Sequence, residues 1–213
     1  MMKKLLQKLT VFVCLTLSSF YCYGQPEWTA SYDFGYAFHP SHFLELENGL
    51  IAKTKYNYGL TEYISGGVDF PYMPFEVYVD VSATEQYFKA KFPEHDDYVH
   101  NFLLQLRPGF GVRFSIKSMD VSPLIQAGIS YNLNLYKGFY GTKKDQLNGG
   151  TNNSFGIGVV DRDDESGFVL ELVLPNQPFY NKDFTPDGGH YYPYANLVPK
   201  KMWELAVHYF QRF

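Results

Sequence analysis

The chain has almost no cysteine. Its two cysteines, Cys14 and Cys22, both lie within the first 24 residues. Beyond residue 24 the sequence therefore offers no disulfide framework, no thiol nucleophile and no cysteine-ligated zinc site. The acidic run 161–165 lacks the glycine and the terminal glutamate of a calcium-binding loop. We therefore predict neither a metal nor a cofactor.

A long hydrophobic run is also missing after residue 24. No later stretch approaches the roughly 18 to 20 consecutive apolar residues that a transmembrane helix requires. A closed β-barrel is the other structure that satisfies every backbone group in lipid. If this chain spans a membrane, it is expected to do so as a barrel.

Basic residues are few once the first segment is set aside. Residues 1–24 contain three lysines and no acid, followed by an almost uncharged apolar run, which is typical of a secretory signal. We predict cleavage before Gln25, which leaves residues 25–213 as one barrel domain. That domain has 15 basic and 22 acidic residues, a net charge of −7. Nucleic acid is therefore not an expected partner.

From residue 28 onward, apolar or aromatic residues alternate with small or polar ones in segment after segment. This period of two is the pattern of β-strands with one apolar face. It predicts ten strands: 28–38, 50–58, 64–70, 75–82, 86–92, 102–116, 121–133, 155–159, 168–174 and 203–213.

The last of these segments alternates up to the final residue, Phe213. In this it resembles the closing strand of Gram-negative outer-membrane β-barrels. The resemblance implies an outer-membrane location and contact with membrane lipid and lipopolysaccharide. It also implies that Phe213 is a signal for the barrel-assembly machinery. A monomer is the default oligomeric state.

A shorter resemblance covers about fifteen residues. The stretch 58–62, followed by Gly66, Gly67 and the triplet 70–72, looks like the strand, turn and strand of the phenol-degradation outer-membrane barrel family. That family is linked to uptake of apolar compounds. Length, signal and ending also resemble the small barrels of Bacteroidota.

Ten strands agree with the even strand number of bacterial barrels. We predict turns at 60–62, 83–85, 117–120 and 161–166, and long outer segments at 136–153 and 175–200. Eight strands are the alternative, reached if 86–92 is a loop. A soluble sandwich or lipocalin-like barrel would also alternate, but its apolar face would point inward.

Charged residues on the small and polar face are the first candidate site, because they would line the barrel interior. There they would either form a packed ionic network or line a selective pore. The candidates are Asp33, Lys53, Lys55, Glu76, Asp80, Arg107, Arg113, Glu171, Glu204, His208 and Arg212.

Aromatic residues in the segment 176–200 are the second candidate site, for binding at the outer surface. They are Phe179, Tyr180, Tyr191, Tyr192 and Tyr194. The run 39–42, His-Pro-Ser-His, also has residue types found in outer-membrane lipid A deacylases, but not their His-x-Ser-Asn arrangement.

The sequence therefore predicts an all-β transmembrane barrel without enzymatic activity. The preferred function is a small pore or passive uptake of small or apolar solutes. A structural or adhesive barrel with a plugged interior is one alternative, and a lipid A-modifying enzyme is another.

Overall fold

The fold is taken from a computed structural model. It describes residues 26–39, 53–91, 99–137, 149–163, 165–177, 201 and 203–213. Within the strands, only the backbone is described at 53–57, 88–91, 99–103 and 134–137. No helix among these described residues is long and apolar enough to cross a membrane.

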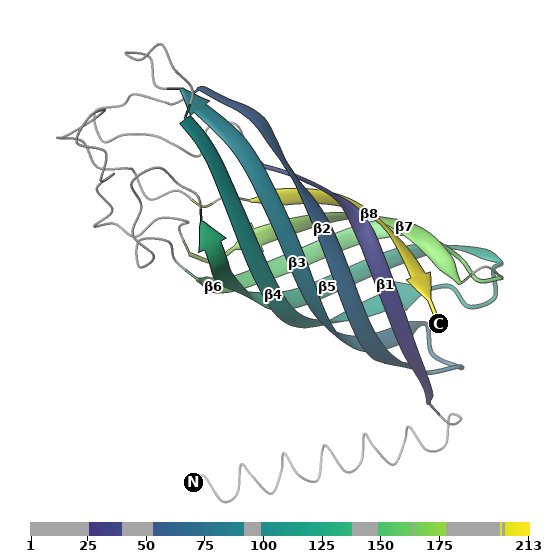
Figure 1. Cartoon of the computed structure of the whole chain (residues 1–213). Coiled ribbons are helices and arrows are strands. Elements are labelled where there is room, and N and C mark those ends of the chain that lie inside the picture. Colours follow the sequence, from purple (N-terminus) through teal and green to yellow (C-terminus); the bar gives the residue numbers. More distant parts are fainter. Residues whose placement is uncertain are drawn as a thin grey trace, which may run out of the picture.

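Antiparallel strands close into a barrel (Figure 1). Each strand pairs with its neighbours in sequence, and β1 pairs with β8 to complete the ring. The described residues form eight strands: β1 (Glu27–Phe38), β2 (Lys53–Asp69), β3 (Phe75–Lys91), β4 (Val99–Ser115), β5 (Val121–Lys137), β6 (Gly150–Asp161), β7 (Ser166–Pro175) and β8 (Glu204–Arg212).

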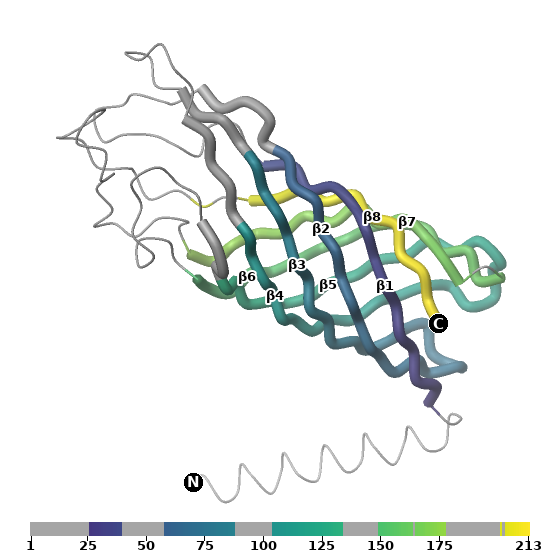
Figure 2. The backbone as a smooth tube through the Cα atoms, viewed as in Figure 1, coloured from purple at the N-terminus to yellow at the C-terminus, as the bar shows by residue number. Residues whose placement is uncertain are grey.

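The two ends of the barrel differ in the length of their connections. Short turns join β2 to β3, β4 to β5 and β6 to β7, at the same end as the start of β1 and the end of β8 (Figure 2). In the first turn Met73 N–H donates to the Phe70 carbonyl at 2.9 Å, and in the second Met119 N–H donates to Ile116 at 3.3 Å. We call this end the turn end, and the opposite one the loop end.

The burial pattern is the reverse of that in a water-soluble barrel. Outward side chains along the strands are mostly apolar and exposed; Ile64 is 69% exposed, Val79 62% and Ile157 61%. Inward side chains are mostly polar, and many are buried. They include Asp33, Glu76, Gln86, Gln105, Arg107, Arg113, Gln126, Glu171, Glu204 and His208.

The barrel has eight strands, so the prediction of ten was wrong. The predicted turn 60–62 lies inside β2, and the predicted turn 83–85 lies inside β3. Pairing between these strands continues through both positions, from Tyr58 opposite Tyr87 to Asp69 opposite Glu76.

The polar residues that suggested turns simply continue the alternation. Thr61 and Thr84 face inward and share a hydrogen bond of 3.1 Å, while Glu62 and Glu85 point outward. The alternative count of eight strands is confirmed, but not for the predicted reason, because 86–91 belongs to β3 and is not a loop. The predicted turns at 117–120 and 161–166 are confirmed, and residues 71–74, which separate the predicted strands 64–70 and 75–82, form the β2–β3 turn.

A small apolar cluster fills part of the interior near the turn end. It consists of Leu124, Val160, Val169 and Phe210, each at most 2% exposed. These side chains come from β5, β6, β7 and β8. The remaining interior is held by polar contacts.

Candidate functional site

The predicted interior residues are brought together inside the barrel. Seven of them, from β1, β3, β4, β7 and β8, are buried: Asp33, Glu76, Arg107, Arg113, Glu171, Glu204 and His208. Asp80 and Arg212 also point inward and are partly buried. The side chains of Lys53 and Lys55 lie outside the described residues.

A tight ion pair lies toward the loop end. The Arg107 guanidinium donates to both carboxylate oxygens of Glu204, with Nη1 at 2.7 Å from Oε1 and Nη2 closer still to Oε2. Nη2 also donates to Gln105 at 2.8 Å, and the Gln86 amide donates to the same oxygen at 3.1 Å. A bidentate arginine–carboxylate pair has fixed geometry, so it ties β4 to β8 across the interior.

His39, just beyond β1, packs against this pair. Its Nε2 lies 3.7 Å from Glu204 Oε2, and its side chain is 3% exposed. Ser41, which would have to meet His39 in a serine hydrolase, lies outside the described residues. In the described part of the chain, His39 faces a carboxylate that already binds Arg107.

Arg113 is shared among several weaker contacts nearer the turn end. Its guanidinium nitrogens lie 3.9 Å from Asp33 Oδ2 and 3.7 Å from Glu76 Oε1. Nε donates to Gln126 at 3.4 Å, and the guanidinium carbon lies 4.2 Å from the centre of the Tyr78 ring. A cation against an aromatic face is attractive when water is excluded, so Tyr78 partly takes the place of a dedicated carboxylate.

His208 joins β8 to strands on both of its sides. Its Nδ1 lies 3.1 Å from Asp33 Oδ2 on β1, and its Nε2 lies 3.7 Å from Glu171 Oε2 on β7. Tyr63 stacks on the imidazole with ring centres 4.9 Å apart and donates a 3.1 Å hydrogen bond to Glu171. These contacts connect the first and last strands, where the barrel closes.

Further pairs close the network at the turn end. Glu76 accepts hydrogen bonds from Thr29, at 2.7 Å, and from Arg212. Lys117 donates to Asp69 at 2.6 Å. Paired polar side chains therefore extend through the interior from the turn end to the Arg107–Glu204 pair, beside the apolar cluster.

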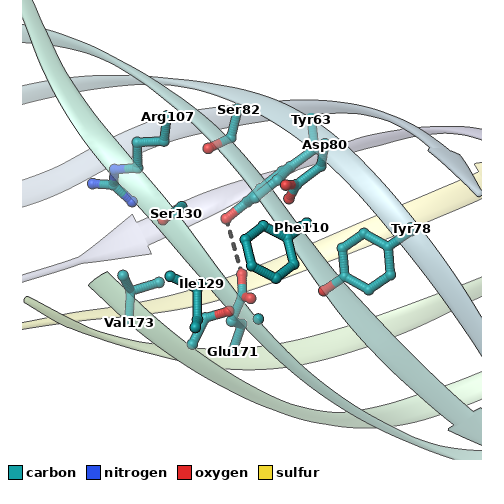
Figure 3. A pocket seen from close by; sticks show the side chains of 12 residues that line it. Tyr63, Tyr78, Asp80, Ser82, Arg107, Phe110, Ile129, Ser130, Glu171 and Val173 are labelled. Carbon is teal, nitrogen blue, oxygen red and sulfur yellow. Dashed lines mark hydrogen bonds between the residues drawn. The ribbon is translucent and has the colours of Figure 1, made fainter. Parts of the chain in front are cut away.

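A cavity of about 20 Å³ remains between these clusters (Figure 3). Such a space is about large enough for one water molecule. Asp80, Tyr63, Tyr78, Arg107 and Glu171 line it. Two acids line this cavity, Asp80 and Glu171. No ion pair joins Asp80 to another described residue, so its carboxylate is available to solvent.

The sequence analysis selected these interior residues by their charge. That criterion missed the uncharged residues of the same network. Tyr63, Tyr78, Gln105 and Gln126 all contact the charged groups. Their positions in the alternation could have placed them inside, because Tyr63, Tyr78 and Gln105 share parity with charged residues on their own strands and Gln126 shares parity with Ser122 and Ser130 on β5. Sequence reasoning had no means of pairing them.

Other predicted sites are not tested by this geometry. The aromatic candidates between Phe179 and Tyr194 lie outside the described residues. Phe213 is described: it is 77% exposed, and its backbone N–H donates to the Ala30 carbonyl at 2.9 Å. Within the described ranges, no group of three or more histidine, cysteine, aspartate or glutamate residues could hold a metal ion.

Comparison with known proteins adds no family to this description. No protein-family model matches the chain, and no curated protein matches its sequence.

Proposed function

We propose that this chain is an exported, integral outer-membrane β-barrel with a filled interior, which serves as a non-enzymatic scaffold displaying its loop end at the cell surface. The observation that carries this proposal is the reversed burial: apolar side chains face outward around the barrel while arginine and carboxylate groups are buried within. In water, this arrangement would expose a continuous apolar surface. In lipid, the apolar outer surface is favourable except at the outward carboxylates of Glu62 and Glu85, and the closed ring satisfies the backbone groups of its strands.

The spacing of aromatic side chains on the outer surface supports the membrane proposal. At the turn end, the rings of Phe70, Phe75 and Phe114 form a row with centres 5.3 and 6.1 Å apart. Toward the loop end, Tyr58 on β2 is opposite Phe38 on one side and Tyr87 on the other.

Tyr58 and Phe70 are twelve positions apart along the chain. At about 3.3 Å per residue they are separated by about 40 Å along the strand, and a strand tilt of about 40° reduces this to about 30 Å along the barrel axis. A bilayer hydrocarbon core is about 30 Å thick. The two aromatic rows therefore have the spacing of membrane interfaces.

The filled interior favours a scaffold over an open channel. An eight-strand barrel is just wide enough for side chains to fill it. One cavity between the Arg107–Glu204 pair and the Arg212–Glu76 pair has room for about one water molecule. A solute crossing this region would meet both pairs.

Passive uptake of small or apolar solutes is the second candidate. The unpaired Asp80 beside the cavity favours it, because a polar group left for solvent is a feature of water-lined pathways. Ion conductance distinguishes the two functions.

The deciding experiment is conductance of the refolded protein in a planar bilayer, with Glu204→Gln and Arg113→Gln measured alongside. A scaffold is expected to insert, to show heat-modifiable mobility in gels, and to remain silent. Discrete openings whose ion selectivity changes in either variant would replace the scaffold with a pore. Failure to insert into lipid would reject the membrane proposal itself.

Orientation is tested with single cysteines at the two ends of β7. Gln177→Cys lies at the loop end and Asp163→Cys at the turn end, and both positions are exposed. On intact cells, an impermeant thiol reagent is expected to label Gln177→Cys and to spare Asp163→Cys. Reversed labelling would overturn the proposed orientation.

A further inference from the structure

A second and larger cavity opens at the turn end, at the rim where β1 and β8 meet the β6–β7 turn. Its volume is about 250 Å³. Charged side chains of both signs and two exposed aromatic rings surround it. Those used below are Glu27, Trp28, Arg162, Glu165, Arg212 and Phe213.

Most of the charged side chains around this cavity do not form ion pairs with other residues of the barrel. Glu27 and Glu165 have no ion-pair partner among the described residues. Arg162 donates only to a neutral group, the Ser115 hydroxyl at 2.9 Å, and its Nε has no hydrogen-bond partner. Arg212 is paired with Glu76, and its Nε is likewise without a partner. Three carboxylates and two guanidiniums therefore adjoin one cavity, and one of these carboxylates, Asp69, is paired with Lys117.

The backbone around the cavity is fixed by hydrogen bonds between distant segments. Arg212 N–H donates to the Glu165 carbonyl at 2.8 Å, and Phe213 N–H donates to Ala30 at 2.9 Å. Arg162 N–H donates to Asp120 in the neighbouring turn, also at 2.9 Å. A rim held in this way is ordered before any ligand arrives, which lowers the entropy lost on binding.

Glu165, which lies on this rim, has an unfavourable backbone conformation. Its φ is 51°, the one positive φ of a non-glycine residue in the described chain. Glycine adopts this region freely, whereas a side chain there is disfavoured. Strained backbone conformations collect at functional sites. The carboxylate of Glu165 at the cavity supplies a reason for glutamate at a position that suits glycine.

We propose that this cavity binds a free amino acid, with the ligand carboxylate on Arg162 and Arg212 and the ligand ammonium on Glu165 and Glu27. Charges of both signs around one cavity complement a zwitterion and disfavour a ligand of a single sign. A volume of about 250 Å³ leaves room for one amino acid. Trp28 and Phe213 offer flat faces for the ligand side chain or its ammonium group.

The proposal is tested by calorimetric titration of the full chain refolded in detergent micelles, so it does not depend on membrane location. Alanine, leucine and lysine are titrated first, and the tightest binder is then compared with its N-acetyl and its amide derivatives. We expect saturable 1:1 binding of the zwitterion and at least about tenfold weaker binding of each derivative, because each lacks one charge-assisted interaction.

Glu165→Gly separates binding from folding. Glycine relieves the positive φ, so the unfolding midpoint in urea is expected to rise while amino-acid binding weakens at least about tenfold. Arg162→Gln is expected to weaken binding equally. Glu85→Gln, an outward-facing position on β3 remote from the turn end, is the matched control and should bind as the parent does.

Three results would overturn the proposal. The first is absence of binding by all three amino acids to the folded parent protein. The second is equal affinity for the zwitterion and its derivatives. The third is unchanged affinity in Glu165→Gly. If Arg162→Gln fails to fold, Glu165→Gly decides the matter alone, since its expected gain in stability keeps it measurable.

Discussion

Two buried arginines on the same strand are held in different ways. Arg107 has a dedicated bidentate carboxylate, Glu204. Arg113, six residues along β4, has no contact that close: two carboxylates lie 3.7 and 3.9 Å away, and an aromatic ring covers its face. Both guanidiniums are about equally buried, so the difference lies in how their charge is balanced.

The comparison shows that a buried charge can be stabilised by one strong pair or by a distributed set. Removing one member of a dedicated pair leaves an uncompensated charge in a medium of low dielectric constant. Removing one member of a shared set leaves its partners with other contacts. Asp33 would retain His208 and Ser31, and Glu76 would retain Arg212 and Thr29.

The largest expected effect comes from breaking the dedicated pair. Glu204→Leu leaves Arg107 buried with only the Gln105 amide oxygen as acceptor. The free energy of unfolding is expected to fall by about 3–5 kcal/mol. Urea titration in detergent micelles, followed by tryptophan fluorescence, measures this loss. A change below about 1 kcal/mol would mean that solvent reaches Arg107.

A smaller loss is expected when the shared arginine is removed. Arg113→Met keeps the length of the side chain and its contact with the Tyr78 ring while removing the charge. Because Asp33 and Glu76 keep other partners, the loss is expected to be about 1–3 kcal/mol. The same titration applies. A loss as large as that of Glu204→Leu would show that Arg113 is the principal counter-ion of both acids.

Replacing both members of the dedicated pair should recover most of the stability. In Arg107→Met with Glu204→Leu no charge is left uncompensated, and apolar side chains of similar volume are often neutral or stabilising in place of a buried ion pair. We expect a stability within about 1 kcal/mol of the parent protein. The two single variants complete a double-mutant cycle, and additive losses would contradict a direct pair.

The smallest effect concerns a charge on the outer surface. Glu62 lies between the two aromatic rows along β2, and its side chain is exposed on the outer face. Glu62→Leu is expected to stabilise the barrel in lipid bilayers by about 1 kcal/mol, because a lipid-facing carboxylate is unfavourable. Glu85→Leu, closer to the Tyr87 interface, should change less. Destabilisation of both variants would contradict lipid at this face.

Alternation in the sequence predicted the direction of most side chains correctly. Phe155, Ile157 and Val159 point outward on β6, and Glu204, Ala206 and His208 point inward on β8. The predicted turns at 60–62 and 83–85 were wrong, because the polar residues there continue the strand alternation of β2 and β3. Thr61 and Thr84 satisfy each other across β2 and β3, and only pairing between those strands could have revealed this.

The sequence by itself determined the all-β class, the inward and outward faces and two of the turns, because these depend on a local period of two and on local turn residues. The tertiary structure decided the strand number, the partner of each buried charge and the two cavities. Arg107 and Glu204 are 97 residues apart in sequence. Register and closure bring such residues together, and both are properties of the whole ring of strands.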